Sequence, residues 1–161
     1  MGLVHIYCGD GKGKTSAAVG LAVRAAGCGK RVVIARFLKT DNSGEVEILK
    51  KIPEVTLIPC RKTFGFVRSM DEETKRECAA YHRELFGEAV KLAEHADLVV
   101  FDEIMAAVNY GMVPERDVLE FLENRPGRDQ TDGLEIVLTG RDPSEKLIAA
   151  ADYVSEICKR K

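Results

Sequence analysis

The segment that most constrains the fold is the glycine- and lysine-rich stretch Gly9–Ser16, which reads GDGKGKTS. It follows the apolar run Leu3–Cys8, typical of a buried strand, and leads into Lys14–Cys28, where alanine, valine and leucine recur at helical spacing. A glycine-rich turn between a strand and a helix is typical of a phosphate-binding loop, because glycines let backbone N–H groups converge. The usual pattern is G-x-x-x-x-G-K-[ST], and Cys8 stands where its first glycine would be.

The residues of this loop predict distinct roles at a bound polyphosphate. The helix that opens after Gly13 presents the positive end of its dipole to anions. Lys14 is expected to reach the outer phosphates and Thr15 to ligate Mg²⁺ or Mn²⁺, while Lys12 adds a second cation. The nucleotide-binding residues predicted from the loop are Gly9, Asp10, Gly11, Lys12, Gly13, Lys14, Thr15 and Ser16.

The rest of the chain alternates short apolar runs with segments of helical period. This alternation predicts right-handed βαβ units and an α/β fold, in which helices flank a mostly parallel sheet of five or six strands. Residues 1–161 are expected to form one domain. The further strands are expected at Arg31–Phe37, Val55–Pro59, Asp97–Phe101, Leu134–Thr139 and Tyr153–Cys158. The further helices are expected at Glu45–Ile52, Asp71–Glu94, Val113–Glu123 and Pro143–Ala151.

Two helix ends carry capping signals. Ser69 is a candidate N-cap for the long helix, because Glu72 follows it by three residues and completes a capping box. Asn109-Tyr110-Gly111 is expected to end a helix, with Gly111 as its C-terminal cap. The segment between Cys60 and Met70 shows no periodicity and is expected to be a loop.

Acidic and basic residues follow several of the expected strands. The run DLVVF ends in Asp102 and Glu103, and ligands of parallel sheets bind at the carboxyl ends of the strands. The metal candidates are therefore Thr15 and Glu103, with Asp102 as a further acid. By the same argument Arg141, after the fifth strand, is expected to face the nucleotide. Lys39 and Glu45 follow the second strand in the same way.

Composition excludes several classes of protein. The net charge is −2 and basic residues form no long tract, so binding to nucleic acid is not expected. No apolar run approaches the roughly 20 residues of a membrane span, and the N-terminus lacks the features of a signal peptide. The five cysteines and three histidines show no metal-ligand spacing. Free thiols in a cytoplasmic protein are therefore expected.

The sequence around these motifs resembles one family. Six stretches occur in order: GDGKGKTSAAVGLAVRAAGCGKRVVIARFLK, SGE, GF, DLVVFDEIMAAVNYGMV, VLTGRDP and AADYVSEI. Together they resemble the ATP:corrinoid adenosyltransferases of the cobalamin-biosynthesis type, over nearly the whole chain. That family has G-N-G-K-G-K-T at its loop and also lacks the first glycine, so Cys8 is what the family would show.

The resemblance implies a RecA-like P-loop domain, usually a homodimer. It also implies that the loop holds ATP in a reversed orientation, so that the ribose C5′ rather than the γ-phosphate is presented for attack. Cobalt(I) of a reduced corrinoid attacks the ribose C5′, and triphosphate leaves; a reductase must supply the cobalt(I). The expected catalytic residues are Lys14, Thr15 and Arg24, since Arg24 matches a family arginine that contacts phosphates. Backbone amides of the loop, Lys12 and Mg²⁺ would stabilise the negative charge of the leaving triphosphate.

Phe66 and Arg68 stand at the positions of the motif with which the family contacts the corrinoid. In the family, G-F-T-W supplies an aromatic pair that displaces the lower axial ligand of cobalt. Here the segment reads GFVR, so Phe66 matches the phenylalanine and Arg68 stands in place of the tryptophan. The guanidinium of Arg68 could stack on the ring or pair with a carboxylate or phosphate of the corrinoid; alternatively, this step is altered or lost. The family often has longer termini, which implies a corrinoid pocket that is more open here or is completed by a partner subunit.

Two other functions fit the same motifs. A P-loop ATPase or kinase would use this scaffold to cleave ATP at the γ-phosphate. A non-catalytic protein would bind nucleotide or corrinoid and leave ATP unchanged. The fate of ATP separates the three hypotheses, because only adenosyl transfer releases triphosphate.

Overall fold

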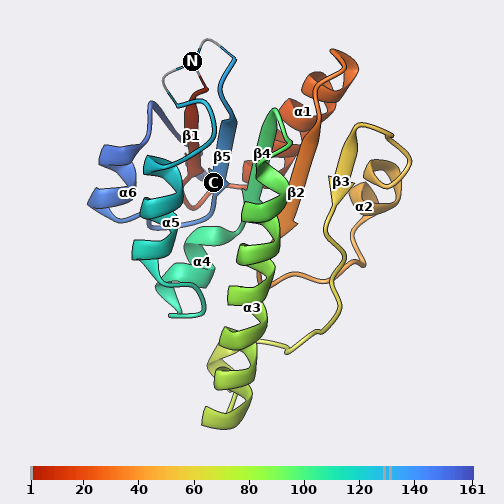
Figure 1. The fold of residues 1–161 in the computed structure, drawn as a ribbon. Helices are drawn as coiled ribbons and strands as arrows, with labels where there is room; N and C mark the ends of the chain where they lie inside the picture. Colours follow the sequence, from red (N-terminus) through yellow and green to blue (C-terminus); the bar gives the residue numbers. More distant parts are fainter. Residues whose placement is uncertain (1, 129, 131) are drawn as a thin grey trace.

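The computed structural model describes residues 2–128, 130 and 132–161. Within this part of the chain six strands form one parallel sheet in the order β3-β2-β4-β5-β1-β6 (Figure 1). The strands are β1 (Val4–Cys8), β2 (Val32–Arg36), β3 (Val55–Leu57), β4 (Leu98–Asp102), β5 (Glu135–Thr139) and β6 (Tyr153–Glu156). The predicted α/β class and parallel sheet are confirmed.

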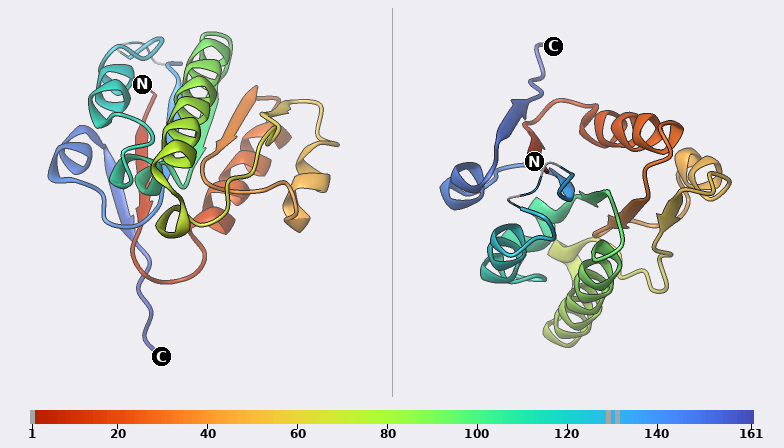
Figure 2. Two further views of the ribbon diagram at one scale, coloured as in Figure 1. Left: turned by 90° about the horizontal axis from the view of Figure 1, so that it is seen from below. Right: turned by 45° about the horizontal axis from the view of Figure 1, so that its top comes forward.

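Helices cover both faces of the sheet (Figure 2). On one face α1 (Lys14–Gly27) and α2 (Gly44–Leu49) pack on the strands. The helices α3 (Glu72–Ala93), α4 (Ile104–Asn109), α5 (Glu115–Glu123) and α6 (Glu145–Ala150) contribute to the core on the other face. None of the helices in the described part of the chain combines the length and apolar composition that crossing a bilayer requires.

Strands β2 and β4 are buried at every position, as expected for central strands covered on both sides. Ala18, Ala22 and Ala26 lie four residues apart on α1 and are buried against the sheet, where their small side chains suit close packing. The opposite face is filled by larger groups, including the ring of Phe101, which lies 5.6 Å from that of Phe121. The buried faces of strands and helices thus follow directly from the apolar pattern of the chain.

Strand order determines which strand ends meet. Strand β5 lies between β1, which leads into the glycine-rich loop, and β4, which ends in Asp102. Because all these strands run parallel, their carboxyl ends lie along one edge of the sheet. That edge brings Cys8, Asp102 and Thr139 close to the start of α1.

The predicted cap at Ser69 is wrong. Ser69 ends a short 3₁₀ turn, Val67–Ser69, and the N-cap of α3 is Asp71, whose carboxylate accepts a hydrogen bond from the Thr74 N–H at 2.7 Å. Val67 is partly buried against the core and holds the chain in the turn, so the helix begins later. The predicted cap at Gly111 is confirmed: its φ is 71° and its N–H donates to the Val108 carbonyl at the end of α4.

His82 on α3 is a buried histidine whose protonation opposes folding. Its side chain is 3% exposed, and its ring centroid lies 5.9 Å from that of Phe37 and 5.1 Å from that of Tyr81. Among the described residues its Nδ1 has no hydrogen-bond partner. Burial lowers the pKa of His82 from 6.5 to about 4, because the apolar surroundings disfavour the imidazolium.

We therefore expect acid to destabilise the protein through His82. Below about pH 6.5 the unfolded chain takes up a proton that the folded chain excludes until about pH 4. The free energy of unfolding should fall across this window by up to about 1.4 kcal/mol per pH unit. Urea unfolding of the wild type and His82→Leu at several pH values measures this slope. The slope should shrink in His82→Leu and persist in His95→Gln, which changes an exposed histidine; an unchanged slope in His82→Leu would contradict the assignment.

Candidate nucleotide-binding site

The glycine-rich loop encloses the ammonium group of Lys14. Gly9 and Gly13 have φ values of 99° and 117°, which an L side chain would disfavour. The chain therefore curls, and Lys14 Nζ donates to the carbonyls of Gly9 and Gly11, both at 2.7 Å. Lys14 is only 7% exposed. The loop thus holds a buried positive charge at the N-terminus of α1, where the helix dipole also favours an anion.

Cys8 replaces the usual first glycine because the chain is still a strand at that point. Cys8 pairs with Glu156 of β6, and its carbonyl accepts a hydrogen bond from the Ile157 N–H at 2.8 Å. The turn begins only at Gly9, so Cys8 needs no left-handed backbone. Cys8 is buried in the core, and burial raises the pKa of its thiol, which disfavours the reactive thiolate.

The segment after β6 packs against the loop, and sequence reasoning missed this contact. The Gly11 N–H donates to the Ile157 carbonyl at 2.7 Å, and the Lys159 N–H donates to Asp10 Oδ1 at 3.0 Å. A Cβ at Gly11 would lie 2.6 Å from the Ile157 oxygen, and one at Gly9 would also clash with it. These two glycines are therefore required by the neighbouring backbone as well as by the turn.

Asp102 is the acid that meets the loop. It is 2% exposed, and its Oδ1 accepts hydrogen bonds from the Thr15 hydroxyl at 2.9 Å and the Thr139 hydroxyl at 2.7 Å. Glu103 follows with a φ of 61°, and its N–H donates to Thr139 Oγ1 at 2.9 Å. The structure thus brings Thr15 and Asp102 into contact, with Glu103 as the next residue at the strand end. No role was predicted for Thr139 from the sequence, although its position at the end of an expected strand is a signal that could have identified it.

Lys39 places a second ammonium group beside Thr15 and Asp102. Its Nζ donates to Thr15 Oγ1 at 2.7 Å and also pairs with Asp102 Oδ2. A cation is therefore accommodated between a hydroxyl and a carboxylate, which are ligands that suit Mg²⁺ or Mn²⁺. Among the described residues no three His, Cys, Asp or Glu side chains cluster as a metal site. A divalent ion here would take its remaining ligands from phosphate or water, as Mg²⁺ commonly does.

A cavity of about 640 Å³ opens beside Thr15 and Lys39. One wall is α1, and the other is the chain between β2 and α2. Arg36 shapes this second wall: its Nη1 donates to the Thr40 carbonyl at 3.0 Å and to Ser43 Oγ at 3.2 Å, and its Nη2 pairs with Asp41. The volume suits a small-molecule ligand. The other lining residues are Ser16, Val19, Gly20, Thr40, Asn42, Ser43 and Glu45.

The remaining basic candidates lie at different distances from the loop. Arg141 Nη2 lies 3.5 Å from the Asp10 carbonyl, so Arg141 lies beside the loop as expected. Lys12 is exposed on the loop itself. Arg24 lies in the last turn of α1, exposed and ten residues after Lys14, which is about 15 Å along the helix axis. The structure therefore does not bring Arg24 to Lys14 within one chain.

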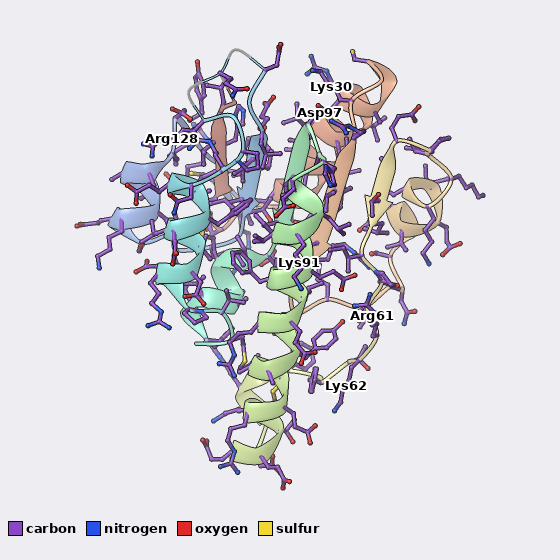
Figure 3. The ribbon with its side chains drawn as sticks, in the orientation of Figure 1. Lys30, Arg61, Lys62, Lys91, Asp97 and Arg128 are labelled. Atoms are coloured by element: carbon purple, nitrogen blue, oxygen red, sulfur yellow. The ribbon has the colours of Figure 1, made fainter. Side chains whose placement is uncertain are left out.

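The loop between β3 and α3 is fastened to α3 by ion pairs. Arg61 makes two hydrogen bonds with Glu88, at 2.6 and 2.8 Å, and Lys62 Nζ lies 2.6 Å from Glu77. Figure 3 shows both basic residues on the loop where it runs beside α3. The loop is thus held at its start on the side of the sheet covered by α3.

Phe66 and Arg68 point away from the core. Phe64 and Val67 are partly buried and pack against it, whereas Phe66 is 86% exposed and Arg68 is also exposed. Phe66 is therefore not a packing anchor of the loop. An exposed phenylalanine and, two residues later, an exposed arginine leave an aromatic face and a guanidinium available to a ligand.

The parallel sheet, with β5 between the loop strand and the acidic strand, defines a P-loop NTPase-like fold. The model of the ATP:corrinoid adenosyltransferase family BtuR/CobO/CobP matches residues 1–161, and the chain belongs to this family. The resemblance seen in the sequence is confirmed.

Curated relatives agree with this assignment. The chain is 33% identical over 159 residues to a corrinoid adenosyltransferase of Escherichia coli K12, covering 97% of this chain and 76% of that protein. It is 34% identical over 158 residues to the corrinoid adenosyltransferase CobA of Salmonella typhimurium, with the same coverages. A corrinoid adenosyltransferase of Pseudomonas aeruginosa is 29% identical over 159 residues, covering 97% of this chain and 74% of that protein.

Proposed function

We propose that this protein transfers the 5′-deoxyadenosyl group of ATP to cobalt(I) of a reduced corrinoid and releases triphosphate. The observation that carries the proposal is the buried Lys14 ammonium inside the glycine-rich loop, in a chain of the adenosyltransferase family. Such a loop is suited to bind a polyphosphate, which in this reaction is the leaving group rather than a group to be transferred.

The reaction exchanges one bond to carbon for another. An electron pair of cobalt(I) forms the bond to C5′ of the ribose, and cobalt becomes formally cobalt(III). The C5′–oxygen bond breaks, and its electron pair leaves with the triphosphate. The corrinoid supplies its own nucleophile, so no general base is required of the protein.

The protein's contribution is to hold the triphosphate and stabilise its charge. Lys14 and the N–H groups at the start of α1 would bind the phosphate oxygens, with Lys12 and Arg141 at the edge of the loop. Thr15 and Asp102, with Glu103 as the neighbouring acid, would hold a Mg²⁺ or Mn²⁺ ion, which would neutralise part of the phosphate charge when bound. The cavity between α1 and the chain before α2 would take the nucleoside.

The corrinoid would bind over the loop that carries Phe66 and Arg68. The exposed ring of Phe66 offers an apolar face against the lower side of the corrinoid, where displacing the axial ligand makes cobalt easier to reduce. Arg68 offers a cation for stacking or for a carboxylate or phosphate side chain of the corrinoid. Arg24 remains a predicted phosphate contact.

We also propose that the protein is a cytoplasmic homodimer and that a reductase generates the cobalt(I) of its corrinoid substrate. These proposals rest on what the resemblance to the family implies. A nucleic-acid partner is not part of the proposal, because the net charge is −2 and no long basic tract occurs. A membrane partner is not part of it either, because no apolar run approaches the roughly 20 residues of a membrane span.

The fate of ATP tests the function directly. Mixed anaerobically with Mg-ATP and a chemically reduced corrinoid, the protein should release one triphosphate per corrinoid converted. Phosphorus NMR identifies the phosphate products, and absorbance follows formation of a light-sensitive alkylcobalt product. A control without reductant should leave ATP intact. ADP and phosphate as the products would instead show an ATPase or kinase, and intact ATP in the complete mixture would show a binding protein.

A further inference from the structure

We propose that Lys39 is a built-in counter-cation of the nucleotide site. Its ammonium occupies the position of a divalent ion between Thr15 and Asp102 while the nucleotide is absent, and it moves onto the nucleotide's phosphates when a metal–ATP complex binds. The inference rests on the proposed function only in taking ATP as the ligand. It concerns binding and does not depend on adenosyl transfer.

The charges around Asp102 support this role. Asp102 is 2% exposed, and a buried carboxylate is strongly destabilising unless it is paired. Its hydrogen bonds from Thr15 and Thr139 come from neutral hydroxyls. The buried ammonium of Lys14 donates instead to two loop carbonyls. Among the described contacts, the positive charge paired with Asp102 is therefore that of Lys39.

The backbone before Lys39 is held in a conformation that directs it into the site. Leu38 has a φ of 52°, which is uncommon for a bulky residue and persists only where surrounding contacts enforce it. Those contacts are present: Asp41 pairs with Arg36 and accepts from the Cys60 N–H, and the Cys60 thiol donates to the Lys39 carbonyl. The position of Lys39 is thus built into the fold.

The side chain of Lys39 also has room to leave. It is 26% exposed, and it lines the cavity of about 640 Å³ beside Thr15. Its flexible four-carbon stem allows the ammonium to move while the backbone stays in place. A phosphate oxygen bound at this edge of the cavity would give the displaced ammonium a new partner.

A divalent ion and the Lys39 ammonium cannot share the position, because they would bind the same two oxygens and repel each other. A free metal ion must therefore displace the Lys39 ammonium from Asp102 without offering that ammonium a new anionic partner. A metal bound together with ATP supplies phosphate oxygens that accept the lysine. Lys39 thus couples metal binding to nucleotide binding, so that the site discriminates against a metal ion alone.

The test measures Mn²⁺ binding to the protein without corrinoid, by electron paramagnetic resonance of the free ion. In Lys39→Met the affinity of the nucleotide-free protein for Mn²⁺ should rise about 10-fold, since the competing ammonium is gone. The affinity for ATP in the presence of Mn²⁺ should fall about 10-fold, since a phosphate partner is lost. Lys39→Gln, which keeps a polar side chain, should show the same two changes.

Two controls fix the interpretation. Lys39→Arg keeps a positive charge and should bind free Mn²⁺ as weakly as the wild type. Lys50→Met makes the same substitution at an exposed lysine on the end of α2 and should change neither affinity. An unchanged Mn²⁺ affinity in both neutral variants overturns the proposal, and so does a fall in both affinities, which indicates a structural role. ATP is not consumed in this experiment, so its outcome is independent of whether the protein transfers the adenosyl group.

Discussion

Replacing Lys14 by alanine is expected to abolish turnover, with a fall in the rate of adenosyl transfer of about 10³-fold or more. The Lys14 ammonium is buried and bound at 2.7 Å by the carbonyls of Gly9 and Gly11. In the variant these carbonyls would face the leaving triphosphate without an intervening cation. Single-turnover kinetics with reduced corrinoid and saturating Mg-ATP measure the loss.

Lys12→Ala provides the matched control for this prediction. Lys12 lies on the same loop but is exposed, so its charge is screened by water and its removal should reduce the rate far less. Thermal unfolding of both variants separates a loss of charge from a loss of fold. A near-normal rate in Lys14→Ala would count strongly against the site.

Gly11→Ala is expected to disrupt the loop, reducing both stability and nucleotide affinity. The added Cβ would lie 2.6 Å from the Ile157 carbonyl oxygen, the same atom that accepts the Gly11 hydrogen bond at 2.7 Å. Relief of this clash must separate the loop from the segment after β6. Overpacking of this kind typically lowers stability by about 1–3 kcal/mol, and denaturant unfolding and ATP titration would measure the two effects.

Replacing Gly87 by alanine should change stability in the opposite direction. Gly87 lies within α3, and no atom lies within 4 Å of a Cβ placed there. Alanine should stabilise this helix by about 0.5–1 kcal/mol and leave ATP binding unchanged. If Gly11→Ala were as harmless as Gly87→Ala, the contact between the loop and Ile157 would not hold the site together.

Features that depend on near neighbours in the chain could be read from the sequence. The glycine-rich loop, the buried strands and the helices each follow from spacing within one short segment, because turns and amphipathic faces are local properties. At the start of α3 the sequence was insufficient. Ser69 was predicted as the N-cap, whereas Asp71 caps the helix in the structure, after a turn in which Val67 packs against the core.

The sequence by itself therefore determined the class of fold, the family and the position of the glycine-rich loop between a strand and a helix. Only the tertiary structure decided which residues meet at the site. Asp102 contacts Thr15 and Lys39 across 87 and 63 residues of chain, and Lys159 contacts Asp10 across 149. Such contacts depend on the order in which strands are placed side by side, with β5 between β1 and β4 and β6 beyond β1. That order is a property of the packed sheet and is not encoded in the spacing of any one segment.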